Sequence, residues 1–119
     1  MKKIFLIDDD RAIRLVLSAI LKKHNYIPVE VSTGMEAVEL FKKELPAAVL
    51  LDVKMPGMDG IEILKQLKLI DPDVPVIIVT GYADIATAVQ AIKLGAYDFL
   101  SKPPHVDKLI LTLARAIEN

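Results

Sequence analysis

Short apolar runs alternate with amphipathic segments along this chain, and this alternation restricts the fold more than any other feature of the sequence. The apolar runs cover residues 3–8, 26–31, 47–52, 76–80 and 97–101. Short apolar runs bounded by turn residues are typical of strands that are buried on both faces, as in a parallel sheet covered by helices. The pattern therefore predicts an α/β protein.

An amphipathic helix is predicted after each strand. Thr33 with Glu36, and Asp59 with Glu62, have the spacing of a capping box at the start of the second and third helices. Asp84 is expected to cap the fourth helix. The apolar positions expected to face the sheet are, helix by helix, Ile13, Val16, Leu17 and Ile20; Ala37, Val38, Phe41 and Leu45; Ile61, Leu64 and Leu67; Ile85, Ala88, Val89 and Ile92; and Val106, Leu109, Ile110, Leu113 and Ile117.

Five strand–helix units fit a single domain of 119 residues. Connections between parallel strands are right-handed, which leaves few possible arrangements. The flavodoxin-like (βα)5 fold, a doubly wound parallel sheet with strand order 2-1-3-4-5, accommodates these units, and its switch point lies between strands 1 and 3. Ligands are therefore expected beside Asp8 and Asp52, which end these two strands.

The composition excludes several classes of protein. The 15 basic and 16 acidic residues give a net charge of −1, so no global field attracts nucleic acid or an anionic membrane. The chain has no cysteine, so it contains neither a disulfide framework nor a thiolate metal site. No apolar run approaches the length of a membrane span or of a secretory signal. We therefore expect a cytoplasmic protein that binds neither membranes nor nucleic acid directly.

Charged and polar residues follow four of the predicted strands. Asp8 and Asp9 come at the end of the first strand, Asp52 ends the third, Thr80 the fourth, and Lys102 follows the fifth. These four strands are neighbours in the predicted order. Two carboxylates about 4 Å apart repel each other by about 4 kcal/mol at an effective dielectric constant of about 20, so either a cation lies between them or some of the acids are protonated. Carboxylate and carbonyl oxygens suit Mg²⁺, which we take as the cofactor.

Asp52 is the carboxylate that these neighbours would activate. An Asp beside Mg²⁺, with an ammonium group close by, is equipped to attack phosphorus and become an aspartyl phosphate. The metal and Lys102 would hold oxygens of the transferring group, and Thr80 would hydrogen-bond to one of them. Taken alone, Lys102 would be a solvated charge and Asp10 a helix cap. The joint placement of these residues favours phosphoryl transfer.

Four motifs carry a resemblance to a known family. They are Asp8-Asp9, Asp52 with the segment VKMPGMDG after it, Thr80-Gly81, and Lys102-Pro103. Together they resemble the receiver domain of two-component response regulators, over essentially the whole of residues 1–119. The segments VTGYAD and GAYDFL look most like receivers of the nitrogen-regulation (NtrC-like) group of transcriptional regulators.

The resemblance implies a role for each matching acid. It makes Asp52 the phosphoacceptor. It also makes Asp9, Asp52 and the backbone carbonyl of Lys54 direct Mg²⁺ ligands, with Asp8 acting largely through water.

The resemblance also implies a response to phosphorylation on the neighbouring strands. Thr80 would be the switch hydroxyl, Phe99 the switch aromatic, and Lys102 the phosphate-binding cation, with a cis Lys102–Pro103 bond. Two departures stand out. Phe99 lacks the hydroxyl of the commoner Tyr, and Pro104-His105 stands where the family often has an aromatic residue.

The function implied is a phosphorylatable signalling switch, and not an enzyme that turns over a free substrate. A sensor histidine kinase would phosphorylate Asp52. The face formed by the fourth helix, the fifth strand and the fifth helix would then bind or release an output domain or a downstream protein, and so regulate transcription. Ala91, Leu94 and Leu111 are candidates for an exposed output or homodimer face.

Other functions stay open from the sequence alone. One is a stand-alone receiver that acts by protein–protein interaction without an attached output domain, and another is a receiver that is never phosphorylated. A flavin-binding protein of the same fold needs a hydroxyl- and glycine-rich loop where this chain has DDDR. A Mg²⁺ phosphatase with an aspartyl intermediate usually has a second acid where this chain has Lys54. The chain stops directly after its last predicted helix, which we expect to reflect truncation of a longer regulator.

Overall fold

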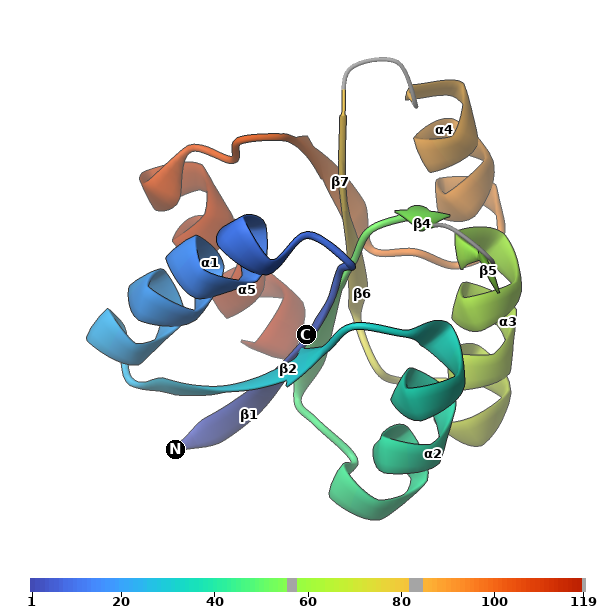
Figure 1. Cartoon of the computed structure of the whole chain (residues 1–119), viewed down its shortest axis with the longest axis horizontal. Helices are drawn as coiled ribbons and strands as arrows, with labels where there is room; N and C mark the ends of the chain where they lie inside the picture. The colour runs from blue at the N-terminus through green and yellow to red at the C-terminus, as the bar shows by residue number, and fades with distance from the viewer. Residues whose placement is uncertain (56–57, 82–84, 119) are drawn as a thin grey trace.

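The computed structural model describes residues 1–55, 58–81 and 85–118, and its central feature is a sheet of five parallel strands (Figure 1). The strands are β1 (Lys2–Ile7), β2 (Tyr26–Val31), β3 (Ala48–Leu51), β6 (Val76–Thr80) and β7 (Asp98–Ser101). They lie in the order β2-β1-β3-β6-β7, and all four neighbouring pairs are parallel. The predicted order 2-1-3-4-5 is confirmed, because β6 and β7 are the fourth and fifth strands of this sheet.

Helices cover both faces of the sheet, which makes the fold doubly wound (Figure 1). Helices α1 (Arg11–Lys23) and α5 (Val106–Glu118) lie on one face. Helices α2 (Gly34–Glu44), α3 (Gly60–Ile70) and α4 (Ile85–Lys93) lie on the other. Within the described segments, no helix has the length and apolar character required to cross a membrane.

The strand β1 shows why the sequence reads as continuous apolar runs. Its side chains alternate between the two faces. Phe5 and Ile7 belong to the core under α2, α3 and α4. Ile4 and Leu6 belong to the core under α1 and α5. Because both faces are covered, every one of these four residues is at most 1% exposed.

Polar side chains cap the helices that begin near the carboxyl edge of the sheet. Asp10 accepts hydrogen bonds from two backbone N–H groups at the start of α1. The Thr33 hydroxyl accepts from the Glu36 N–H at 3.2 Å, and Asp59 caps α3. The caps predicted at Thr33 and Asp59 are confirmed. The cap predicted at Asp84 lies outside the described residues.

Two apolar positions predicted to face the sheet are exposed instead. Val16 is 59% exposed and Leu45 is 58% exposed. Helix α1 buries Leu17, Ser18 and Leu21, so its inward face is rotated away from Val16. Leu45 follows the last residue of α2 and has a φ of 42°, so the chain has already left the helical path there.

The last two helices also differ from their predicted faces. Ile85, Val89 and Val106 are 38%, 43% and 40% exposed, although the pattern placed them against the sheet. Helix α4 packs instead through Ala88 and Ala91, which are both 0% exposed. The prediction that Ala91 lies on an exposed face is therefore wrong. Small side chains on the inward face let this short helix lie close to the sheet.

Candidate functional site

The polar residues predicted to form a site meet at the carboxyl edge of the sheet. Asp8 and Asp52 directly follow β1 and β3, Thr80 ends β6, and Lys102 directly follows β7. Asp8, Asp52 and Thr80 are 5%, 6% and 1% exposed. Because β1, β3, β6 and β7 are neighbours in one parallel sheet, their ends bring together residues that are far apart in the sequence.

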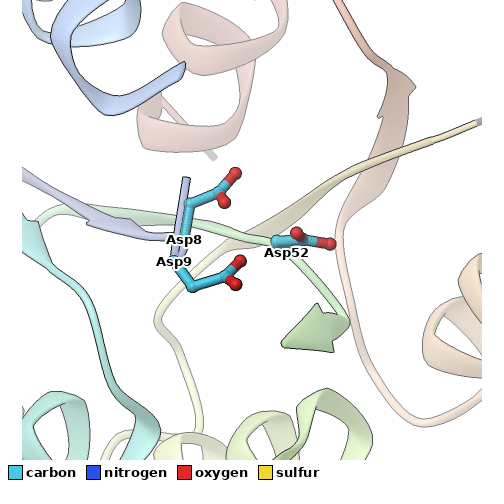
Figure 2. A group of neighbouring side chains, drawn as sticks. All are labelled: Asp8, Asp9 and Asp52. Carbon is cyan, nitrogen blue, oxygen red and sulfur yellow. The ribbon is translucent and has the colours of Figure 1, made fainter. Parts of the chain in front are cut away.

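Three carboxylates converge at this edge (Figure 2). Asp8, Asp9 and Asp52 each offer an oxygen atom, and these oxygens lie within 4.8 Å of one another. Asp8 and Asp52 are buried, whereas Asp9 is exposed. Clustered carboxylate oxygens with an open side toward solvent fit a hard divalent cation that keeps several of its waters. The donor set therefore suits an ion such as Mg²⁺.

Lys102 bridges the two buried acids. Its Nζ lies 2.8 Å from Asp8 Oδ2 and 2.9 Å from Asp52 Oδ2. The Lys102 side chain is 19% exposed, so this ion-pair network is shielded from much of the screening that weakens surface pairs. In this arrangement, the ammonium group is the counter-ion of both carboxylates.

Burial and charge act in opposite directions on this network. Burial raises the pKa of the Asp8 carboxyl above its ordinary value, and the hydrogen bonds from Lys102 and from the Asp10 N–H offset only part of that rise. Burial would lower the pKa of the Lys102 amine, but the hydrogen bonds and charges of Asp8 and Asp52 outweigh it and raise that pKa. Lys102 is therefore a full cation at neutral pH.

Backbone groups fix the two buried carboxylates. The Asp10 N–H donates to Asp8 Oδ1 at 2.9 Å. The Lys54 N–H donates to Asp52 Oδ1 at 3.0 Å, and the Asp52 N–H itself donates to the Ile7 carbonyl at 2.9 Å. Each acid thus accepts a hydrogen bond through Oδ1 from the peptide N–H two residues later. This turn leaves the second carboxylate oxygen, Oδ2, facing Lys102.

The loop after Asp52 depends on a close approach at Gly60. In this loop, β4 (Lys54–Met55) pairs with β5 (Met58–Asp59), and the Gly60 N–H donates to the Val53 carbonyl at 3.3 Å. A Cβ atom added at Gly60 would lie 2.3 Å from Val53 Cα, so only glycine fits here. Pro56 and Gly57, predicted to shape this loop, lie outside the described residues.

The remaining predicted residues lie on the two strands beyond β3. Within the described part of the chain, the buried Thr80 Oγ1 has no hydrogen-bond partner. The Thr80 carbonyl accepts from the Lys102 N–H at 2.8 Å. Phe99 is partly buried and packs against the core under α4. The Lys102–Pro103 peptide, for which the resemblance implied a cis bond, is cis.

Arg14 belongs to this region and was missed by the sequence analysis. Its Nη1 donates to the Asp8 carbonyl at 2.6 Å, and its Nε lies 3.4 Å from Glu30 Oε1. A signal was present, because Arg14 stands three and four residues before the buried Leu17 and Ser18 and therefore shares their helical face. A basic residue on the inward face of the first helix, next to a cluster of acids, indicates an ion pair or a hydrogen bond to that cluster.

Known proteins share both the sequence and this fold. The response regulator receiver domain family matches residues 4–114. The C4-dicarboxylate transport transcriptional regulatory protein DctD of Rhizobium meliloti is 40% identical over 116 residues, which are 98% of this chain and 25% of DctD. Sporulation initiation phosphotransferase F of Bacillus subtilis is 40% identical over 108 residues, which are 91% of this chain and 87% of that protein. The chain thus spans about a quarter of the length of a regulator such as DctD.

Solved structures agree with these matches. The receiver domain of NtrX from Brucella abortus matches with a TM-score of 0.93 and 35% identity, and the match covers 98% of each chain. This likeness is consistent with the nitrogen-regulation group that the sequence motifs resemble. The family match, the similar relative of nearly the same length and the shared fold lead to one conclusion: the chain belongs to the response regulator receiver domain family.

Proposed function

We propose that this chain is a phosphorylatable switch of a two-component system, acting in the cytoplasm. In this proposal, Asp52 accepts a phosphoryl group from a sensor histidine kinase. The observation that carries the proposal is the convergence of three carboxylate oxygens within 4.8 Å, two of them on acids bridged by Lys102. A nucleophilic carboxylate, a cation site and an ammonium group are the components that phosphoryl transfer to an aspartate requires.

The cation site would consist of Asp9, Asp52 and the backbone carbonyl of Lys54, with Asp8 acting through water. When bound, Mg²⁺ would neutralise part of the negative charge on the transferring group. The exposed position of Asp9 gives this site an open side, where a phosphoryl donor can enter. These ligand assignments follow the family resemblance and the clustered oxygens.

Asp52, Lys102 and Thr80 would each have a separate role in the transfer step. A carboxylate oxygen of Asp52 attacks phosphorus, and the bond between phosphorus and the donor's imidazole nitrogen breaks. Lys102, which in this structure bridges Asp8 and Asp52, would instead pair with a phosphoryl oxygen. The buried Thr80 hydroxyl, which has no hydrogen-bond partner among the described residues, would donate a hydrogen bond to another phosphoryl oxygen.

The output of the switch would be the face formed by α4, β7 and α5. Movement of Thr80 toward the phosphoryl group would change the packing around Phe99, which lies on the neighbouring strand β7. On this face, Leu94 and Leu111 are 40% and 51% exposed, as their positions in the sequence predicted. An output domain, a downstream protein or a second copy of the chain would bind there, and the relation to DctD favours control of transcription.

Acetyl phosphate with Mg²⁺ tests the proposal without a kinase. Wild-type protein should gain the mass of one phosphoryl group, and Asp52→Asn should gain none. Asp73→Asn, which removes an exposed acid just before β6 and therefore at the opposite edge of the sheet from the site, is the matched control and should behave like wild type. Incorporation into Asp52→Asn equal to that of wild type, or none into wild type, would contradict the proposal.

A second candidate is a stand-alone receiver that passes its phosphoryl group or its signal to a separate protein. The similarity to sporulation initiation phosphotransferase F favours this candidate, because the region that matches this chain makes up 87% of that relative. The reading frame that encodes the chain distinguishes the two: a frame that continues into further domains supports an attached output.

A further inference from the structure

The guanidinium group of Arg14 contacts the backbone of the acid site, at the carbonyl of Asp8. We infer that Arg14, held by Glu30, is a positioning residue that fixes the peptide between Asp8 and Asp9 and so sets the geometry of the cation site. This inference rests on the proposed function. Its structural basis is the 2.6 Å hydrogen bond from Arg14 Nη1 to the Asp8 carbonyl and the 3.4 Å contact from Arg14 Nε to Glu30 Oε1.

Among the described residues, only Arg14 donates a hydrogen bond to the Asp8 carbonyl. The Asp8 N–H donates to the Val31 carbonyl, and the Asp8 carboxylate is held by Lys102 and by the Asp10 N–H. The carbonyl belongs to the planar peptide that continues into Asp9. Its direction therefore sets where the Asp9 Cα and side chain lie. Because Asp9 is exposed, the position of its carboxylate depends on this backbone.

An arginine suits this position better than any other cation. Its planar group presents donors in two directions, so one side chain reaches both the Asp8 carbonyl and Glu30. The Arg14 side chain is only 13% exposed, so the geometry is shielded from water. Glu30 lies on the edge strand β2, where it is the register partner of Leu6. Strand β2 thus braces the end of β1 through Glu30 and Arg14, and again through the Val31 carbonyl.

Charge and position have opposite effects at this site. Removing the positive charge of Arg14 would by itself strengthen the attraction of the three carboxylates for a divalent cation. Losing the restraint on the Asp8–Asp9 peptide would weaken cation binding. Substitutions that keep the charge isolate the second effect. Arg14→Lys keeps the cation but loses the second donor direction, and Glu30→Asp keeps the anion but withdraws it from Arg14.

The test is a Mg²⁺ titration of the full chain, followed by amide chemical shifts in ¹H–¹⁵N NMR spectra. We expect Arg14→Lys to raise the Mg²⁺ dissociation constant by about tenfold, as loss of an outer restraint on metal ligands does elsewhere. Glu30→Asp should also raise the Mg²⁺ dissociation constant, by a smaller factor. Arg115→Lys, at an exposed position on α5, is the matched control and should leave the constant unchanged. With acetyl phosphate, the slower phosphorylation of Arg14→Lys should disappear at saturating Mg²⁺.

Each outcome decides between positioning and a merely structural role. A structural role would lower the melting temperature of Arg14→Lys and leave its Mg²⁺ affinity at the wild-type value, and that result would overturn the inference. A phosphorylation defect that persists at saturating Mg²⁺ would also overturn it. If Arg14→Lys does not fold, Glu30→Asp decides, and a wild-type dissociation constant in that variant rejects the inference. A wild-type protein that binds no Mg²⁺ would reject the proposed function as well.

Discussion

The middle of the sheet and its carboxyl edge bury different kinds of side chain at similar depth. In the middle, Ile4, Phe5 and Leu6 are at most 1% exposed. At the edge, Asp8 and Asp52 are 5% and 6% exposed. Burial of apolar surface stabilises a fold by about 25 cal/mol per Å², whereas a buried carboxylate lowers stability unless it is paired. The apolar middle of the sheet therefore stabilises this fold, whereas the stability of the edge depends on the pairing of its carboxylates.

Lys102 offsets the cost of burying two carboxylates at the edge of the sheet. It contacts both buried acids at 2.8 and 2.9 Å. The same acids are the ones proposed to hold Mg²⁺ and to receive phosphate, so the counter-ion has to be one that can move. Substitutions in the middle should accordingly change stability alone, while substitutions at the edge should change stability and cation binding together.

The largest effect is expected at Phe41 of α2, which packs on the middle of the sheet. Its ring packs edge-to-face against Phe5, with 5.9 Å between ring centroids, and the side chain is 0% exposed. Phe41→Ala should lower the free energy of unfolding by about 3–5 kcal/mol, because it leaves a cavity that the core cannot close. Urea denaturation measures this change. Met35→Ala, in the same helix but at a 78% exposed position, is the control and should stay within about 0.5 kcal/mol. Equal losses in the two variants would contradict the comparison.

The next effect is expected at Gly60, the first residue of α3, which lies against the loop after Asp52 at the carboxyl edge. A Cβ atom there would lie 2.3 Å from Val53 Cα and 2.6 Å from the Val53 carbonyl oxygen, next to Asp52. Gly60→Ala should lower the free energy of unfolding by about 1–3 kcal/mol, because a backbone segment has to shift to relieve the contact. It should also weaken Mg²⁺ binding, since the displaced loop carries the Lys54 carbonyl, a proposed ligand of the ion. Unchanged stability and unchanged affinity would show that this loop has room to relax.

The sequence predicted the layout of the fold and the members of the acid site. Parallel topology follows from the apolar runs, and the order of the strands places Asp8, Asp52, Thr80 and Lys102 at one edge. Periodicity and topology are enough for this, because residues at the ends of neighbouring parallel strands meet whatever their side chains are.

Other features depend on tertiary packing and were not accessible from periodicity. The rotation of α1 that exposes Val16 is set by how the helix packs on the sheet. The exposure of Leu45 follows from a left-handed residue at the helix end. Arg14 contacts a carbonyl oxygen, and sequence patterns carry no information about which carbonyl a long side chain reaches.

A moderate effect is expected at the edge when its counter-ion is removed. Lys102→Met leaves two buried carboxylates without their cation, so the free energy of unfolding at neutral pH should fall by about 1–2 kcal/mol, less than for a fully buried pair because the Lys102 side chain is 19% exposed. The pKa of Lys102 is raised in the folded state, so its stabilising contribution is complete below pH 10.5 and is lost as pH rises through the raised value. The difference in free energy of unfolding between the variant and wild type should therefore become smaller at strongly alkaline pH. A variant as stable as wild type at neutral pH would show that the ion pairs contribute nothing.

The smallest effect is expected at Asp8, and it has the opposite sign. Burial raises the pKa of Asp8 above 3.8, so the folded protein loses stability as pH rises from 3.8 through the raised value. Asp8→Asn keeps an acceptor for the Asp10 N–H and removes the buried charge, so it should raise the free energy of unfolding at neutral pH by about 1 kcal/mol. Urea denaturation without metal should show this gain at neutral pH and little of it near pH 3.8, with Asp73→Asn as the exposed control. Added Mg²⁺ should stabilise wild type more than the variant and so narrow the difference in free energy of unfolding, because the proposed cation site uses the charges of all three acids in the folded state. A variant that is less stable than wild type without metal would mean that the pairing of Asp8 with Lys102 outweighs the burial of its charge.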